Sequence, residues 1–237
     1  MRNRIEIDGK SSRCFGLKMA RLPLWTTAAE TVENVALPGV PVEQDRHTGQ
    51  YQDFELTLTG YLTRMPAASE LSRLNAWLQG GRQLVMSTQP QLYGVIRRVG
   101  QIEPVRVGTR ANEIQIPFTF QPFKYSRENF PVALSSPPVS FRYFGNIFSE
   151  PVYRLNVESD AEFTVNGTAL ALTGLTGGIT VDLQRRKIYR EEAGVLTIVQ
   201  EQTAGAFWNM VLRPGVNEIA WTEGITGVSV TVNERWL

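Results

Sequence analysis

The side chains that could do acid–base chemistry are few and scattered in this chain. His47 is the only histidine, and it lies between Asp45 and Thr48 in a long segment without a sustained period. A histidine base acts on a positioned serine or cysteine and is itself oriented by an acid, but the sequence has no Gly-x-Ser-x-Gly nucleophile signature. His47 is therefore predicted to be an exposed loop residue rather than a catalytic base.

Paired carboxylates are no better placed. Glycoside hydrolysis needs two acids that face each other across a cleft. Glu191 and Glu192 are adjacent, so on a strand they point to opposite faces. Asp160 and Glu162 share a face but flank the start of a predicted hairpin. We therefore expect that the protein is not an enzyme and has no catalytic residue.

Metal and cofactor signatures are also missing from the sequence. Cys14 is the only cysteine, which rules out an intrachain disulfide and a thiolate metal site within one chain. The glycine pairs Gly80-Gly81 and Gly177-Gly178 belong to neither a P-loop nor a Rossmann fingerprint. We expect no metal and no cofactor.

The overall composition is that of an ordinary globular protein. The 237 residues carry a formal net charge of +1, which gives no support for direct nucleic-acid binding. No apolar run approaches the length of a membrane span, and the N-terminus has no apolar region of the signal-peptide type. We expect no membrane partner and no export directed by this N-terminus.

The first part of the chain reads as a sheet domain with one helix. Phe54–Thr59 and Ile114–Phe120 alternate apolar and polar residues, as half-buried antiparallel strands do, although Pro117 favours an edge strand or a bulge. Between them, apolar residues at helical spacing predict a helix over residues 66–79, with Pro66 in the first turn and Gly80-Gly81 at the exit. Ser135-Ser136-Pro137-Pro138 is the predicted linker, so the domains are expected at 1–134 and 139–237.

The segment from about residue 22 to 50 has turn signals and no sustained period. A structureless loop of this length inside a compact domain is uncommon. We therefore interpret it as a projecting hairpin or arm that a neighbour orders. The candidate inter-subunit residues on this arm are Trp25, Val35, Pro38, Gly39 and His47.

The second domain is predicted to be an antiparallel β-sandwich. Short apolar runs follow each other closely, and Asn166-Gly167 between two of them is a strong hairpin signal. Two further runs, Phe207–Leu212 and Val216–Trp221, are joined through Pro214-Gly215, which suits a type II turn.

Two tryptophans near this turn are candidates for a partner or glycan surface. An indole can stack on a sugar ring, but core packing is the commoner fate of an aromatic residue in such strands. We expect Trp221 to pack in the core, whereas for Trp208 core packing and an exposed partner or glycan surface both stay open.

The order of features resembles the distal tail proteins of long-tailed siphophages and their prophages. The motifs that carry the resemblance lie in both domains: Gly60-Tyr-Leu, Leu71–Leu78, Leu84–Tyr93, Pro117–Tyr125, Gly145–Pro151, Phe163–Gly167, Gly177–Asp182 and Leu212–Ile219. The arm departs from the family pattern, because Pro38-Gly39 is not followed closely by a second glycine.

The resemblance implies a mostly β fold, with a tail-tube-like first domain and a galectin-like or carbohydrate-module-like second domain. It implies a structural role in the virion, at the tail tip, after assembly in the bacterial host cytoplasm. The expected partners are further copies of the chain in a ring, a hexamer in this family, together with the tail tube protein, the tail-tip protein and receptor-binding proteins. The alternative is a protein that recognises host or cell-wall glycans through the second domain.

Overall fold

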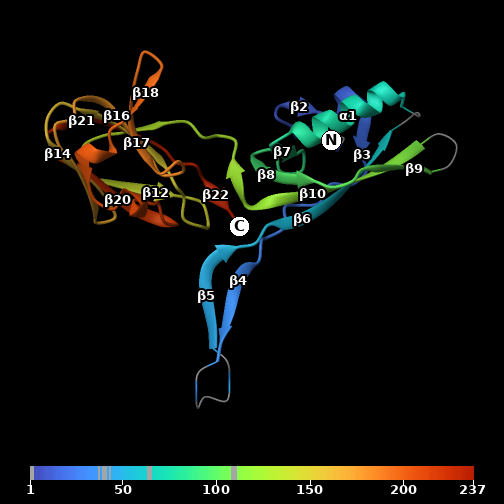
Figure 1. The fold of residues 1–237 in the computed structure, drawn as a ribbon, viewed down its shortest axis with the longest axis horizontal. Coiled ribbons are helices and arrows are strands. Elements are labelled where there is room, and N and C mark those ends of the chain that lie inside the picture. The colour runs from blue at the N-terminus through green and yellow to red at the C-terminus, as the bar shows by residue number, and fades with distance from the viewer. Residues whose placement is uncertain (1–2, 37, 39–41, 43, 63–65, 108–110) are drawn as a thin grey trace. The chain divides into compact units, whose positions relative to one another are not determined.

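The structure is a computed structural model that describes residues 3–36, 38, 42, 44–62, 66–107 and 111–237 (Figure 1). As expected, the described chain is mostly β, and it contains one α-helix. It divides into two compact units, Met1–Arg127 with Leu237, and Glu128–Trp236. This division falls before the linker expected at 135–138, because Val132–Leu134 already pairs within the second unit.

The first unit is built on one antiparallel sheet. Its strands follow the order β2-β1-β7-β8-β10-β6-β3, and β9 also pairs with β10. The elements are β1 (Ile5–Ile7), β2 (Lys10–Ser11), η1 (Ser12–Phe15), β3 (Leu17–Met19), β4 (Glu30–Val35), β5 (Gln44–Tyr51), β6 (Phe54–Leu62), α1 (Ala68–Gly80), β7 (Gln83–Met86), β8 (Leu92–Val99), β9 (Glu103–Val107) and β10 (Ala111–Ser126).

Alternation along β10 and β6 makes the core of this unit. Ile114, Ile116, Phe118 and Phe120 are all buried, as their period of two predicts. Pro117 does not place β10 at an edge, because the strand pairs with β6 on one side and with β9 and then β8 on the other. Pro117 falls between Gln115, the last residue paired with β9, and Phe118, the first paired with β8. No strand residue on that side needs a hydrogen bond from Pro117, so the missing N–H does not interrupt the sheet.

Helix α1 packs on this sheet by the apolar face that its spacing predicts. Leu74 and Leu78 are buried, and Trp77 stacks on Phe15 with ring centroids 4.6 Å apart. The helix begins two residues after the predicted start, with Ala67 as N-cap, whose N–H donates to the Glu70 carboxylate at 3.0 Å. At its end, a Cβ on Gly81 would overlap the Ile7 side chain, so this exit needs glycine.

The second unit is a sandwich of two antiparallel sheets. One has the order β11-β21-β13-β16-β17-β18 and the other β12-β20-β14-β15-β19. The elements are β11 (Val132–Leu134), β12 (Val139–Tyr143), β13 (Val152–Val157), β14 (Ala161–Val165), β15 (Thr168–Leu172), β16 (Gly177–Asp182), β17 (Lys187–Glu192), β18 (Val195–Ile198), η2 (Gln200–Gln202), β19 (Thr203–Ala204), η3 (Phe207–Asn209), β20 (Gly215–Trp221), β21 (Ile225–Thr231) and β22 (Arg235–Trp236).

The two sheets share one apolar core. Tyr153 of β13 and Phe163 of β14 meet edge to face at 5.0 Å, and the Tyr153 hydroxyl donates to the Met210 carbonyl at 2.9 Å. Asn166 and Gly167 both have positive φ and join β14 to β15 in a two-residue hairpin, as the Asn-Gly signal predicts.

The segment before Pro214 corrects the sequence interpretation. Phe207–Asn209 is a 3₁₀ turn, not a strand, and Leu212 makes only a single bridge to Ser149. Gly215 does have the positive φ that the turn requires. The chain bends at Pro214, and β20 begins at Gly215. The predicted reversal is not found, because Leu212 and β20 face Ser149 and β12 in the same antiparallel direction and do not pair with each other.

Candidate functional site

The arm is a two-stranded hairpin that belongs to no larger sheet. Strands β4 and β5 pair only with each other and form a ribbon of their own (Figure 1). Val32 lies opposite His47 on one face, whereas Val35 lies opposite Gln44 on the other. An isolated hairpin of this kind is marginally stable in water. Its valines, 41% and 36% exposed, find no core within the described part of the chain.

Polar contacts tie the two strands of the arm together. His47 Nδ1 lies 3.1 Å from the Glu30 carboxylate, which also accepts the Gly49 N–H at 3.2 Å. Arg46 pairs with Glu33 at 3.9 Å. These contacts lie mainly on exposed side chains, where an ion pair contributes roughly 0–1 kcal/mol. They align the strands without supplying an apolar core.

The structure separates the predicted arm residues into two groups. Val35, Pro38 and His47 lie exposed on or beside the hairpin, and Gly39 lies outside the described residues. Trp25 is not on the hairpin. Residues 22–29 precede β4, and the Trp25 ring packs edge to face on Phe120 at 5.1 Å and on Phe54 at 6.4 Å.

Lys124, which the sequence analysis did not single out, holds the segment before the hairpin. Its side chain is buried, its ammonium donates to the Thr26 carbonyl at 2.8 Å, and it lies over the Phe54 ring at 5.6 Å. Burial lowers the pKa of Lys124 from 10.5 to about 8. Its position was readable, because Lys124 continues the even-numbered parity of the buried residues in β10.

This lowered pKa predicts that stability rises with pH. Between about pH 8 and 10.5 the unfolded chain still holds the Lys124 proton that the folded chain has released, so alkali favours the folded state. The free energy of unfolding of wild type relative to Lys124→Met should increase by about 3 kcal/mol across this range. Urea unfolding of both proteins at pH 7, 8, 9 and 10 measures the difference, and parallel curves would contradict it.

The two candidate tryptophans, Trp208 and Trp221, have different environments. Trp221 is half-buried and packs against the sandwich core. Trp208 is 53% exposed, and its ring meets the buried Phe207 edge to face at 5.5 Å. Trp208 is thus the one of the pair that offers an open aromatic face to a partner or glycan.

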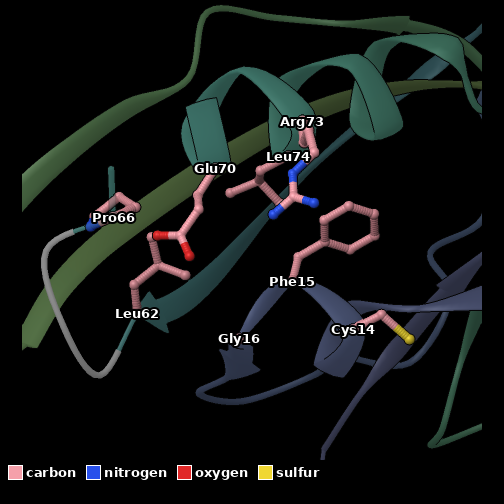
Figure 2. Close-up of a pocket in the computed structure, with 8 residues that line it drawn as sticks. All are labelled: Cys14, Phe15, Gly16, Leu62, Pro66, Glu70, Arg73 and Leu74. Atoms are coloured by element: carbon pink, nitrogen blue, oxygen red, sulfur yellow. The ribbon is translucent and has the colours of Figure 1, made fainter. Parts of the chain in front are cut away.

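A pocket of about 250 Å³ lies between η1, the end of β6 and the start of α1 (Figure 2). Figure 2 shows Leu62, Pro66, Phe15 and Leu74 around it, with the Glu70 carboxylate and the Arg73 guanidinium at its side. Glu70 is already engaged as part of the helix cap. Cys14, at the rim, has an exposed thiol but no histidine among the residues that line the pocket.

In the described ranges, no group of three or more histidine, cysteine, aspartate or glutamate side chains could hold a metal ion. No helix in the same part of the chain has the length and apolar character needed to cross a membrane.

Comparison with known proteins identifies a fold. No family model matches the sequence, and neither does any curated protein. Among solved structures, this chain is similar to SPP1 Dit (gp 19.1), described as a paradigm of the hub adsorption apparatus in phages that infect Gram-positive bacteria. The match has a TM-score of 0.72 at 15% identity and covers 99% of both chains. The chain therefore has the fold of SPP1 Dit along its whole length, which confirms the resemblance to distal tail proteins at the level of the fold.

Proposed function

We propose that this protein is a phage or prophage distal tail protein, a structural hub that joins the tail tube to the tail tip. The observation that carries the proposal is the match to SPP1 Dit, because it spans both units of the chain and not a single common β domain. A shared sandwich alone would say little about function.

The arm supports assembly into a ring. Its strands have no partner sheet in the described part of the chain, and each face exposes a valine, so a neighbouring subunit can supply the missing contacts. A ring needs two different patches on each subunit, because each copy contacts one neighbour by one patch and the other neighbour by the second. The hairpin is one such patch, and the surface that receives it is the other.

The first unit builds the ring in this proposal, and the sandwich carries peripheral contacts. The partners are further copies of the chain, six in the ring as the family resemblance implies, with the tail tube protein, the tail-tip protein and receptor-binding proteins. The role is non-catalytic and belongs to the tail tip of the virion, after assembly in the host cytoplasm.

Particle mass is the direct test of the ring. Six copies of the 26.6 kDa chain give about 160 kDa. Mass photometry and negative-stain images of the purified protein, alone and with the tail-tip protein, should show a ring of this mass. A protein that stays monomeric even with its tail partners would overturn the proposal.

Single substitutions on the arm test which face docks. Val32→Asp and Val35→Asp place a charge on opposite faces of the hairpin. We expect the variant on the docking face to lower the ring fraction at least about tenfold, because a buried unpaired carboxylate costs several kcal/mol. The circular dichroism spectrum should not change, since the hairpin belongs to no larger sheet.

The two valine variants serve as controls for each other. If both leave the ring intact, the hairpin is not an inter-subunit contact. Val216→Asp, at a site 71% exposed in the second unit, controls for the added charge itself.

A further inference from the structure

The outer face of the six-stranded sheet in the second unit carries a shallow groove of about 400 Å³. Its floor and walls come from three adjacent strands, β21, β13 and β16. The outward positions that line it are Arg154, Asn156, Gly178, Gly227 and Ser229. This face lies on the opposite side of the sheet from the buried residues Leu155 and Val228.

Strand register explains the shape of the groove. Asn156 lies opposite Gly178 on one neighbouring strand and opposite Gly227 on the other. Arg154, two residues earlier on the same face, lies between Thr180 and Ser229. A polar ridge on β13 is therefore flanked by two positions that have no side chain.

The backbone does not require either glycine. Neighbouring Gly177 has φ +83, where glycine is favoured, but Gly178 and Gly227 lie outside the left-handed region. A Cβ on Gly178 would meet nothing within 4 Å, and one on Gly227 would meet only the Asn156 Cβ at 3.7 Å. Gly227 lies beside a register shift, yet that shift leaves room for a side chain. Glycine inside a strand weakens it and often marks a close approach by a ligand.

Arg154 gives the groove an uncompensated positive charge. Some arginines of this unit pair with acids, as Arg185 does with Asp182, Arg190 with Glu192 and Arg235 with Glu150. Arg154 is exposed and has no ion pair or side-chain hydrogen bond within the described residues. Its guanidinium offers a planar fork that fits a carboxylate or a phosphate with two parallel hydrogen bonds.

The same face continues from Arg154 toward an aromatic side chain. Thr180 lies opposite Arg154 on one side and opposite Tyr189 on the other, so the three form a row across β13, β16 and β17. Tyr189 is half-buried. The row thus holds a cation, a hydroxyl and an aromatic ring in succession. Glu191 has the same strand parity as Tyr189, so its side chain lies on the same face of the sheet. Its negative charge repels an acidic group of a ligand, which favours Arg154 as the position of that group.

We propose that this groove binds an acidic saccharide chain, with a carboxylate or phosphate on Arg154, sugar hydroxyls on Asn156 and Ser229, and a sugar face toward Tyr189. A saccharide combines polar edges with a C–H face that packs on aromatic rings. A single cation is too little for nucleic acid, whose binding depends on many phosphate contacts. The inference goes beyond the hub role and does not require the ring. It also places the saccharide on the other sheet from the one that contacts η3, where Trp208 lies.

Calorimetric titration of the full chain tests the inference with matched ligands. The probes are an oligogalacturonate, its methyl ester, which keeps the sugar but loses the charge, an oligosaccharide phosphate, and inorganic polyphosphate, which has charge without sugar. We expect one or both acidic saccharides to bind. Methyl esterification should weaken oligogalacturonate binding about tenfold or more, in line with the loss of one charge-assisted contact. Polyphosphate should not compete.

Variants locate the site. Arg154→Gln removes the charge, and Gly178→Val fills the groove at an exposed strand position, so each should weaken acidic-saccharide binding about tenfold. Arg142→Gln, at an exposed arginine of β12 in the other sheet, should leave binding unchanged. No binding of either acidic saccharide, equal binding of polyphosphate, or binding lost only in Trp208→Ala would overturn the inference. Ring mass is measured separately, so the hub proposal and this site can fail independently.

Discussion

Replacing Trp25 by alanine is expected to lower the free energy of unfolding of the first unit by about 3 kcal/mol. The indole fills the space above Gly94, where a Cβ would approach it to 2.6 Å, and it packs on Phe54 and Phe120. Losing a large aromatic side chain costs roughly 3–5 kcal/mol when it is fully buried. We take the lower end because Trp25 is only partly buried.

Urea unfolding followed by circular dichroism measures this change, with the transitions of the two units fitted separately. Hydrogen exchange of the β10 amides gives the same quantity locally. The control is Leu24→Ala, since Leu24 is adjacent in sequence and 64% exposed, and its loss should change stability by about 0.5 kcal/mol or less. Equal effects of the two substitutions would show that Trp25 does not pack on this sheet in solution.

The same variant separates folding from assembly. Sequence reasoning placed Trp25 with the inter-subunit arm because the long segment shows no period in which a core residue stands out. The structure instead packs the Trp25 ring against Phe120, and the backbone N–H of Trp25 donates to the Gln89 side-chain carbonyl at 2.9 Å. If Trp25→Ala prevents assembly of the subunit ring, the cause would therefore be a destabilised subunit. A loss of assembly in Val32→Asp would instead come from a damaged contact between subunits.

Local patterns predicted those parts of the fold in which one face of an element is buried. The alternation of Ile114 to Phe120 and the Asn166-Gly167 hairpin are both found as expected, because each signal is contained in a few consecutive residues. The arm strands could not be predicted in this way. Both faces of β4 and β5 are largely exposed, so no apolar period marks them.

Features that depend on the register between strands distant in sequence could not be predicted from the sequence either. The groove exists because Gly178 and Gly227 flank Asn156, and this alignment needs the pairing of three strands. Phe207–Asn209 looked like a strand because aromatic residues favour strands, but its alternation is too short to distinguish a strand from a turn with one buried ring. Phe207 is buried and Trp208 is exposed, a pattern that fits a strand and a 3₁₀ turn equally well.

Asn217 is expected to be the most sensitive polar residue of the sandwich, with Asn217→Asp lowering its free energy of unfolding by about 3–5 kcal/mol. The Asn217 side chain is fully buried. Its amide nitrogen donates to the carbonyls of Arg213 and Gly215 at 2.9 and 3.2 Å. Its oxygen accepts from the Arg213 N–H and from the Asn166 side chain, both at 2.8 Å. One side chain thus fixes the bend at Pro214 and joins it to the β14–β15 hairpin.

Aspartate keeps the shape of this side chain but replaces its NH2 group with a second oxygen. That oxygen faces the two carbonyl oxygens of Arg213 and Gly215. The two donated hydrogen bonds are lost, and a charge is buried among acceptors, which raises the pKa of the new carboxyl in the folded state. A raised folded pKa means that the folded chain binds the proton more tightly, so the defect should shrink as pH falls and protonation restores one donor. Urea unfolding of the variant and of wild type at pH 7 and pH 4.5 would show whether the loss of stability is smaller at the lower pH.

Glu218→Gln is the matched control because it makes the opposite exchange of carboxylate and amide at the next residue of β20. The Glu218 side chain is exposed, and Glu218 contacts Asn166 through its backbone N–H and carbonyl, which the substitution leaves in place. Its substitution should change stability by about 0.5 kcal/mol or less at either pH. If Asn217→Asp were as mild as this control, the buried amide would not be what holds the bend at Pro214, and the bend would have to rest on the positive φ of Gly215 alone.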